Sequence, residues 1–184
     1  NQWVINGTKT WISNGQVADV CMVLAVTDRS KGPFGISQIL VEKEVSPFET
    51  RALHKLGLRA WPTAELYFTD CRVPKGNISG DPSLGYKRTM VFFEVARSRL
   101  AAMSVGIAQA AIDAAINYAR ERKQFGRPIG SFQMIQGMIA DMIAETEAAR
   151  LLTCRAFHLI DKEERCRWQS ALAKAYATEM AVNV

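Results

Sequence analysis

The chain opens with the stretch Trp3-Val4-Ile5-Asn6-Gly7-Thr8-Lys9-Thr10-Trp11-Ile12, in which two strand-like runs flank an Asn-Gly pair. Asn-Gly supplies the positive φ angles of a type I′ turn, so this stretch predicts a β-hairpin. Asn14-Gly15 then ends the second predicted strand. We therefore expect antiparallel strands joined by tight turns in the N-terminal part of the fold.

Three further runs extend this β pattern along the chain. Val20–Thr27 is an apolar run of strand length, and Gly35–Glu42 follows it after a Gly-Pro loop signal. In Ala64–Asp70 apolar and polar side chains alternate, which is typical of a strand with one buried face. Several short strands separated by turn residues predict a small antiparallel sandwich or barrel.

A polar stretch rich in Gly, Pro and Ser, Gly76–Gly85, separates this β region from a helical one. We place a domain boundary there. The predicted fold is α+β, with a β domain over residues 1–80 and part of an up-and-down helical bundle over residues 81–184.

The helical part shows apolar residues at helical spacing. The pattern predicts helix over Tyr86–Arg122, as one helix or as two with a bend near Ala96-Arg97. A further helix, capped by Ser131, is expected to reach Ile160, and a last one to begin near Arg165.

Composition and charge exclude several classes of protein. Of the 184 residues, 48% are hydrophobic and 22% are charged, which is typical of a globular protein. No uninterrupted apolar run is long enough to cross a bilayer, so we expect no transmembrane helix. The net charge of +5 permits anionic ligands, but Lys and Arg are scattered, which favours a solvated basic surface.

The metal-binding residue types do not form a site. The four cysteines are Cys21, Cys71, Cys154 and Cys166. They lack C-x-x-C spacing, which favours free thiols in a reducing compartment. The two histidines lie far apart in the sequence, so no metal site is predicted.

Four segments of the sequence indicate function more specifically than composition or periodicity does. In chain order they are Lys9–Gly15; Lys55–Arg59 with Thr63–Phe68 and Val73-Pro74; Arg97–Gln109; and Arg120–Gly126 with Phe132-Gln133 and Ala140–Met142. Together they resemble the acyl-CoA dehydrogenase family of flavoenzymes, over nearly the whole chain. The resemblance implies a middle β domain followed by the first part of a C-terminal four-helix bundle.

The segment Trp11-Ile12-Ser13 is the first candidate for cofactor binding. On a strand, Trp11 and Ser13 share one face, where an indole could shield the edge of a flavin and a hydroxyl could bond to it. The alternative is a strand tryptophan that fills the core. The resemblance implies that this segment lies against the isoalloxazine ring of FAD.

A second group of cofactor candidates follows the first long helical stretch. The group comprises Arg122, Lys123, Gln124, Phe125 and Gln133. The first three are expected to end a helix, where cations could simply complement the helix dipole. The resemblance implies instead that Arg122 reaches the FAD pyrophosphate of a neighbouring subunit, that Gln133 contacts the same FAD and that Phe125 packs there. A homo-oligomer, usually a tetramer, is thereby implied.

Glu94 and Arg97 lie one helical turn apart and share a face of the predicted helix. From the residues alone they could be an intrahelical ion pair of small energy. The resemblance implies that both bind the CoA part of the substrate, with Glu94 in place of a more familiar Asp.

The implied reaction is α,β-dehydrogenation of an acyl-CoA thioester, with hydride transfer to FAD and electrons passed to electron-transfer flavoprotein. The family's catalytic Glu lies C-terminal to this chain or, in a minority, at the position of Ala96, which cannot abstract a proton. We therefore assign no catalytic residue and expect these residues alone to be inactive. Because the chain starts at Asn1 and ends within a helical pattern, we expect it to be part of a longer protein.

Two other functions remain open at this point. One is a non-catalytic or chemically diverged relative in the same family. The other is a basic nucleic-acid-binding module, supported only by the modest cluster Arg120, Arg122, Lys123 and Arg127. The expected location is the cytoplasm of a prokaryote or the mitochondrial matrix of a eukaryote.

Overall fold

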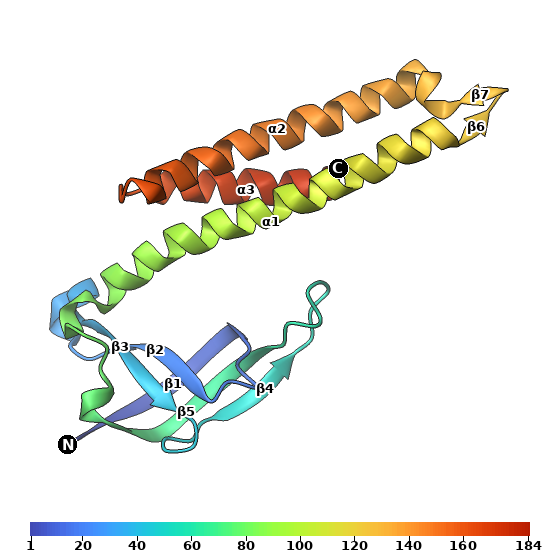
Figure 1. Cartoon of the computed structure of the whole chain (residues 1–184). Helices are drawn as coiled ribbons and strands as arrows, with labels where there is room; N and C mark the ends of the chain where they lie inside the picture. The colour runs from blue at the N-terminus through green and yellow to red at the C-terminus, as the bar shows by residue number, and fades with distance from the viewer. The chain divides into compact units, whose positions relative to one another are not determined.

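In a computed structural model that describes residues 1–184, the N-terminal unit, Asn1–Thr89, contains two antiparallel sheets (Figure 1). Its strands are β1 (Gln2–Ser13), β2 (Val20–Val26), β3 (Ile36–Glu42), β4 (Glu49–Leu53) and β5 (Thr63–Pro74). One sheet has the order β1-β5-β4, and the other pairs β2 with β3. Three short 3-10 helices, η1 (Arg29–Gly35), η2 (Lys75–Asn77) and η3 (Pro82–Leu84), complete the unit. Strand β4 was not expected from the sequence.

The core of this unit lies between the two sheets. Strand β5 shows the expected alternation, with Leu66 and Phe68 buried and Glu65 and Tyr67 only partly buried. Residues of both sheets, together with Phe48 from the loop before β4, form one buried cluster: Ile5, Val23, Ile39, Val41, Phe48, Ala64, Leu66, Phe68, Cys71 and Val73. The predicted antiparallel, sandwich-like β fold is therefore confirmed.

The predicted hairpin at Asn6-Gly7 is wrong, because β1 runs through this pair as one continuous strand. Thr69 and Asp70 of β5 lie opposite Asn6, which makes a bulge at this point. The Asn6 side chain fills the gap: its Nδ2 donates to Asp70 Oδ1 (3.1 Å), and its Oδ1 accepts from the Asp70 N–H (2.7 Å). Gly7, with φ of 146°, supplies the positive φ angle that the sequence signalled, but for a bulge rather than a turn.

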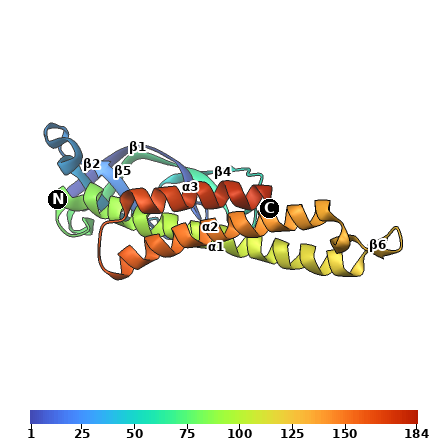
Figure 2. The same cartoon turned by 90° about the horizontal axis from the view of Figure 1, so that it is seen from above.

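The second unit, Met90–Val184, consists mainly of three long helices that pack around one core (Figure 2). Its elements are α1 (Gly85–Glu121), β6 (Lys123–Gln124), β7 (Arg127–Pro128), η4 (Ile129–Ser131), α2 (Gln133–Asp161) and α3 (Arg167–Asn183). Helix α1 begins within the first unit by sequence and is one continuous helix, without a bend at Ala96-Arg97. No Gly or Pro interrupts it there, so nothing in the local sequence forces a kink.

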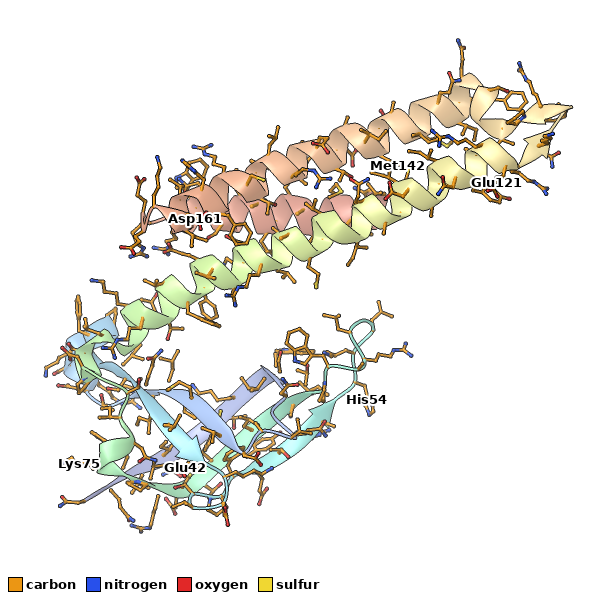
Figure 3. All side chains as sticks on the ribbon, in the orientation of Figure 1. Glu42, His54, Lys75, Glu121, Met142 and Asp161 are labelled. Carbon is orange, nitrogen blue, oxygen red and sulfur yellow. The ribbon has the colours of Figure 1, made fainter.

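The helices pack through small side chains. Alanines with no exposed surface come from all three helices: Ala101 and Ala108, Ala149 and Ala156, Ala173 and Ala177. Small residues allow helix axes to approach closely. Figure 3 shows Asp161 at the C-terminal end of α2 and Glu121 at the C-terminal end of α1, at opposite ends of the helical unit.

The predicted cap of α2 is wrong in detail. Ser131 lies in η4, and its hydroxyl donates to the carbonyl of Pro128 (2.7 Å). The N-cap residue is Phe132, which makes no side-chain capping bond. The helix ends at Asp161, within one residue of the expected end.

The sequence predicted no helix long and apolar enough to cross a membrane, and this prediction is wrong. Pro82–Glu121 contains an 18-residue window with a mean hydropathy of 1.4, so length and composition alone would allow it to cross a membrane. Core helices of soluble proteins meet the same criterion. One side of α1 contributes Ala101, Val105 and Ala108 to the core of the second unit.

Candidate functional site

Trp11 lies at a second bulge in β1. Lys9 pairs with Leu66 and Ile12 pairs with Ala64, so two residues of β1 oppose one residue of β5. Trp11 has φ of 62°, which is rare for a bulky residue and costs conformational energy. Its side chain is 66% exposed, so Trp11 does not fill the core.

The two residues that follow Trp11 in β1 differ in burial. Ile12 is partly buried and packs against the core of the unit. Ser13 is exposed, and it is the last residue of β1. An anchored Ile12 between an exposed indole and an exposed hydroxyl is an arrangement that can receive a flat aromatic ligand.

The loop before β5 lies beside the end of β1. The Asn14 N–H donates to the carbonyl of Pro62 (2.7 Å), and Lys55 Nζ donates to the carbonyl of Trp61 (2.6 Å). Trp61 is exposed. This loop therefore places a second indole on the surface of the same unit.

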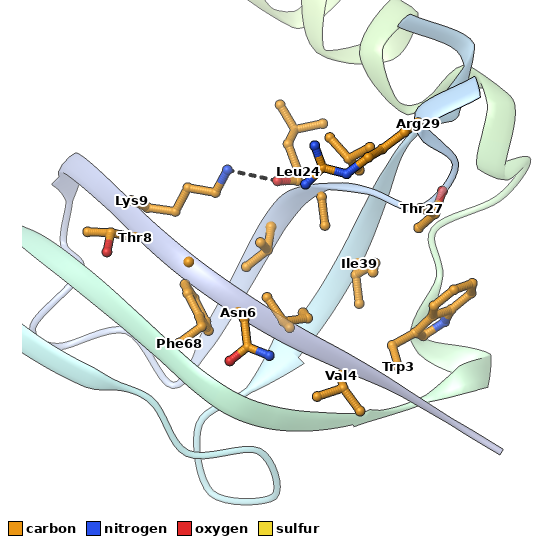
Figure 4. Close-up of a pocket in the computed structure, with 15 residues that line it drawn as sticks. Trp3, Val4, Asn6, Thr8, Lys9, Leu24, Thr27, Arg29, Ile39 and Phe68 are labelled. Atoms are coloured by element: carbon orange, nitrogen blue, oxygen red, sulfur yellow. Dashed lines mark hydrogen bonds between the residues drawn. The ribbon is translucent and has the colours of Figure 1, made fainter. Parts of the chain in front are cut away.

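A separate cleft of about 390 Å³ opens between β1 and β2 (Figure 4). Trp3, Lys9 and Arg29 are among the residues that line it. Lys9 Nζ crosses the cleft and donates to the carbonyl of Leu24 (2.8 Å). None of the predicted site residues lines this cleft.

The second candidate group lies at the α1–α2 connection. Arg122 follows the end of α1, and Lys123 and Gln124 form a two-strand hairpin with β7 rather than the predicted helix end. Phe125 (φ 52°) and Gly126 (φ 78°) form its turn, and positive φ at both central positions is the type I′ geometry. The hairpin thereby holds Phe125 at the tip, where it is 91% exposed.

An apolar surface pocket of about 450 Å³ adjoins this tip. Its lining includes Phe125, Phe132, Gln133 and Met138. The rings of Phe125 and Phe132 meet edge to face at 6.1 Å, and the Arg127 guanidinium lies 4.3 Å from the centre of the Phe132 ring. The structure thus brings Gln133, at the start of α2, together with Gln124 and Phe125.

Arg122 and Lys123 are exposed at this tip and form no ion pair within the chain. A guanidinium without a carboxylate partner is available to an external anion, and it can bind a phosphate with two parallel hydrogen bonds.

Glu94 and Arg97 do not form the ion pair that their spacing allows. The Glu94 side chain is 4% exposed and pairs with Arg165, which lies just before α3. The Arg97 guanidinium lies instead 5.5 Å from the ring centre of Phe93. Hydrogen bonds from Arg165 hold the pKa of the Glu94 carboxyl below its usual range, against the opposing effect of burial.

The two candidate groups of the second unit lie far apart along α1. From Arg97 to Glu121 the helix advances 24 residues, or roughly 36 Å at about 1.5 Å per residue. One chain therefore cannot place Arg97 and Arg122 on the same small group of ligand atoms.

Residues 1–71 match the family of acyl-CoA dehydrogenase middle domains, and residues 84–184 match the family of acyl-CoA dehydrogenase C-terminal domains. The chain is 43% identical to the mitochondrial short-chain specific acyl-CoA dehydrogenase of Mus musculus, over 100% of this chain and 45% of that protein.

Solved structures give the same result at the level of the fold. The glutaryl-coenzyme A dehydrogenase–glutaryl-CoA complex matches with a TM-score of 0.89 and 44% identity, over 99% of this chain and 47% of that one. The prolyl acyl carrier protein oxidase AnaB matches with a TM-score of 0.92 and 26% identity, over 99% and 48%. The chain spans about half the length of the relatives that it matches.

Proposed function

The chain belongs to the acyl-CoA dehydrogenase family, and on that premise we propose that the whole protein oxidises an acyl-CoA thioester between its α and β carbons. The observation that carries this proposal is the exposed Trp11 at a bulge, held in an unfavourable backbone conformation next to an anchored Ile12. Strain of this kind concentrates at functional sites.

We propose FAD as the cofactor, and the residues present fit it. The Trp11 indole would cover one edge of the flavin, with Ile12 beside it, and the Ser13 hydroxyl would donate to a ring heteroatom. The chemistry that FAD supplies when bound is hydride acceptance from the β carbon of the substrate.

The tip hairpin would bind the diphosphate of an FAD held by a second copy of the chain. Arg122 would bond to the phosphates, while Lys123, Gln124, Phe125 and Gln133 would line the approach. The separation of roughly 36 Å between Arg97 and the end of α1 supports a site completed by another subunit. We propose a homo-oligomer, with a tetramer as the expected form.

We propose that substrate binds at the N-terminal half of α1, where Arg97 would contact the CoA moiety. Ala96, on the same helix, has no acidic group, so the base that removes the α proton is proposed to lie outside these residues. We propose electron-transfer flavoprotein as the electron acceptor, and the mitochondrial matrix or a prokaryotic cytoplasm as the location.

The test is the absorbance spectrum of the full-length protein. We expect a flavin spectrum that is bleached by one or more members of an acyl-CoA panel without added reductant. Arg122→Met should lower FAD retention on gel filtration at least tenfold, and Asp113→Asn, an exposed change on α1, should not. A colourless protein, or a flavin that no acyl-CoA reduces, would contradict the proposal.

A diverged substrate class is the second candidate, because a protein with nearly the same fold is named as an oxidase of a prolyl group on an acyl carrier protein. Under that reading the flavin would be bleached by an amino-acyl carrier protein and not by acyl-CoA. The same spectrum therefore separates the two candidates.

A further inference from the structure

We propose that Glu94 is a structural residue that attaches the start of α3 to α1, which leaves Arg97 as the member of the pair that contacts CoA. The part concerning Arg97 rests on the proposed function, whereas the part concerning Glu94 rests on contacts within the chain. This role replaces the CoA contact that the family resemblance implied for Glu94.

Both oxygens of the Glu94 carboxylate are used inside the chain. Oε1 accepts from Arg165 Nε (2.9 Å) and from the Nη2 of the same guanidinium. Oε2 accepts from the backbone N–H of Cys166 (3.0 Å). A buried carboxylate with charge-assisted bonds to both oxygens is a strong point of attachment.

The start of α3 lacks a local capping group. Its N-cap residue, Cys166, makes no side-chain capping bond, and the first turn of the helix carries no acidic residue. The first N–H groups of a helix need acceptors, and its N-terminal dipole favours negative charge. Glu94 supplies the missing carboxylate from α1, although it precedes Cys166 by 72 positions in the sequence.

The charged and titratable groups around Glu94 fit this role. Arg165 and Cys166 face it from the start of α3, and Arg97 lies one turn away on α1. Arg165 is 56% exposed and bonds to Glu94, while Arg97 forms no ion pair in the chain. The Arg97 guanidinium is therefore the cation that remains available to a phosphate or carbonyl of CoA.

The first experiment is a double-mutant cycle on the full-length protein without added ligand. We expect Glu94→Gln to lower Tm by about 5–10 °C, because it leaves Arg165 without its anion. Arg165→Gln should also lower Tm, and the double variant should lose clearly less than the sum of the two. The matched control is Glu147→Gln, which removes an exposed Glu–Arg pair in the same unit and should change Tm by about 1 °C or less.

The second experiment measures the affinity for coenzyme A by titration calorimetry. Arg97→Gln should weaken binding about tenfold or more, and Glu94→Gln should weaken it much less. Additive Tm losses, or a Glu94→Gln variant that keeps its Tm and binds coenzyme A as poorly as Arg97→Gln, would overturn the assignment. Coupled Tm losses together with normal binding by Arg97→Gln would instead count against the proposed CoA site alone.

Discussion

At the scale of single residues, backbone conformation and side-chain partners separate positions that look alike in the sequence. Trp11 and Phe125 are both bulky aromatic residues with positive φ, and both are held on the surface by β structure around them. Trp3, in the same strand as Trp11, is partly buried and packs against the core. Two tryptophans of the same strand therefore have different environments, and Trp11 is the one that lies at a bulge with positive φ.

The backbone cost at Trp11 can be measured with two substitutions. Trp11→Gly and Trp11→Ala both remove the indole, but only glycine adopts a φ of 62° without strain. We expect Trp11→Gly to be more stable than Trp11→Ala by about 0.5–1 kcal/mol in urea unfolding. Both should lose the proposed flavin contact equally. Equal stability of the two variants would show that position 11 is not held in the left-handed region.

The lowered pKa of Glu94 predicts an acid-dependent loss of stability. A carboxyl with a lower pKa in the folded state binds its proton more weakly there, so it stabilises the fold fully above its unfolded-state pKa. That contribution is lost as the pH falls through the lower, folded-state pKa. Between pH 6 and pH 3, Tm should therefore fall more steeply in the wild type than in Glu94→Gln, as measured by circular dichroism. Parallel curves would contradict this linkage.

At the scale of elements, short connections set where the candidate residues lie. The tip hairpin turns through Phe125-Gly126, and the Ile129 N–H donates to the carbonyl of Arg122 (2.8 Å), which closes it. From the sequence, Arg122 to Gln124 were expected to form the last turn of the helix, but α1 ends at Glu121. The hairpin instead presents these side chains beyond the end of α1.

Substitution by alanine should have opposite effects on stability at two glycines of the second unit. Gly126 has φ of 78°, so Gly126→Ala should destabilise the hairpin by about 1 kcal/mol and speed hydrogen exchange at the Ile129 N–H. Gly137 lies inside α2 with open space around it, so Gly137→Ala should stabilise the helix by about 0.5–1 kcal/mol. If Gly137→Ala is destabilising in the intact protein, another surface must cover that side of α2.

At the scale of the whole molecule, the chain has two separate hydrophobic cores. The first is made of large side chains between two sheets, whereas the second is made mostly of alanines between helices. Truncating a large side chain in such a core lowers the stability strongly, because a cavity remains. In a core of alanines, substitution by a larger residue is the more destabilising change, because a closely packed core has no room for added atoms.

Leu66→Ala tests the first core. Leu66 is fully buried between the sheets, so its truncation should lower the unfolding free energy of residues 1–89 by about 2–5 kcal/mol. Hydrogen exchange followed by mass spectrometry should show the loss in β1 and β5. Val17→Ala, at an exposed position of the same unit, should change it by about 0.5 kcal/mol or less. Similar effects of the two substitutions would contradict the burial of Leu66.

The sequence by itself determined what depends on local pattern. Alternation in Ala64–Asp70 and helical spacing from Tyr86 onward predicted the α+β class, because periodicity states which side chains must be buried together. The order of the four motifs predicted the family that the domain matches support. The candidate residues Trp11 and Arg122 were found in the same way.

Only the tertiary structure decided what depends on partners distant in the sequence. The sequence predicted a turn at Asn6-Gly7, but β5 pairs with β1 on both sides of this pair. The sequence also allowed an ion pair between Glu94 and Arg97, but in the fold Arg165 and Cys166 bind Glu94 instead. The physical reason is the same in both cases. The partner of a backbone or carboxylate hydrogen bond is decided by tertiary folding. A rule based on spacing within ten residues cannot specify a partner that lies 64 or 72 positions away.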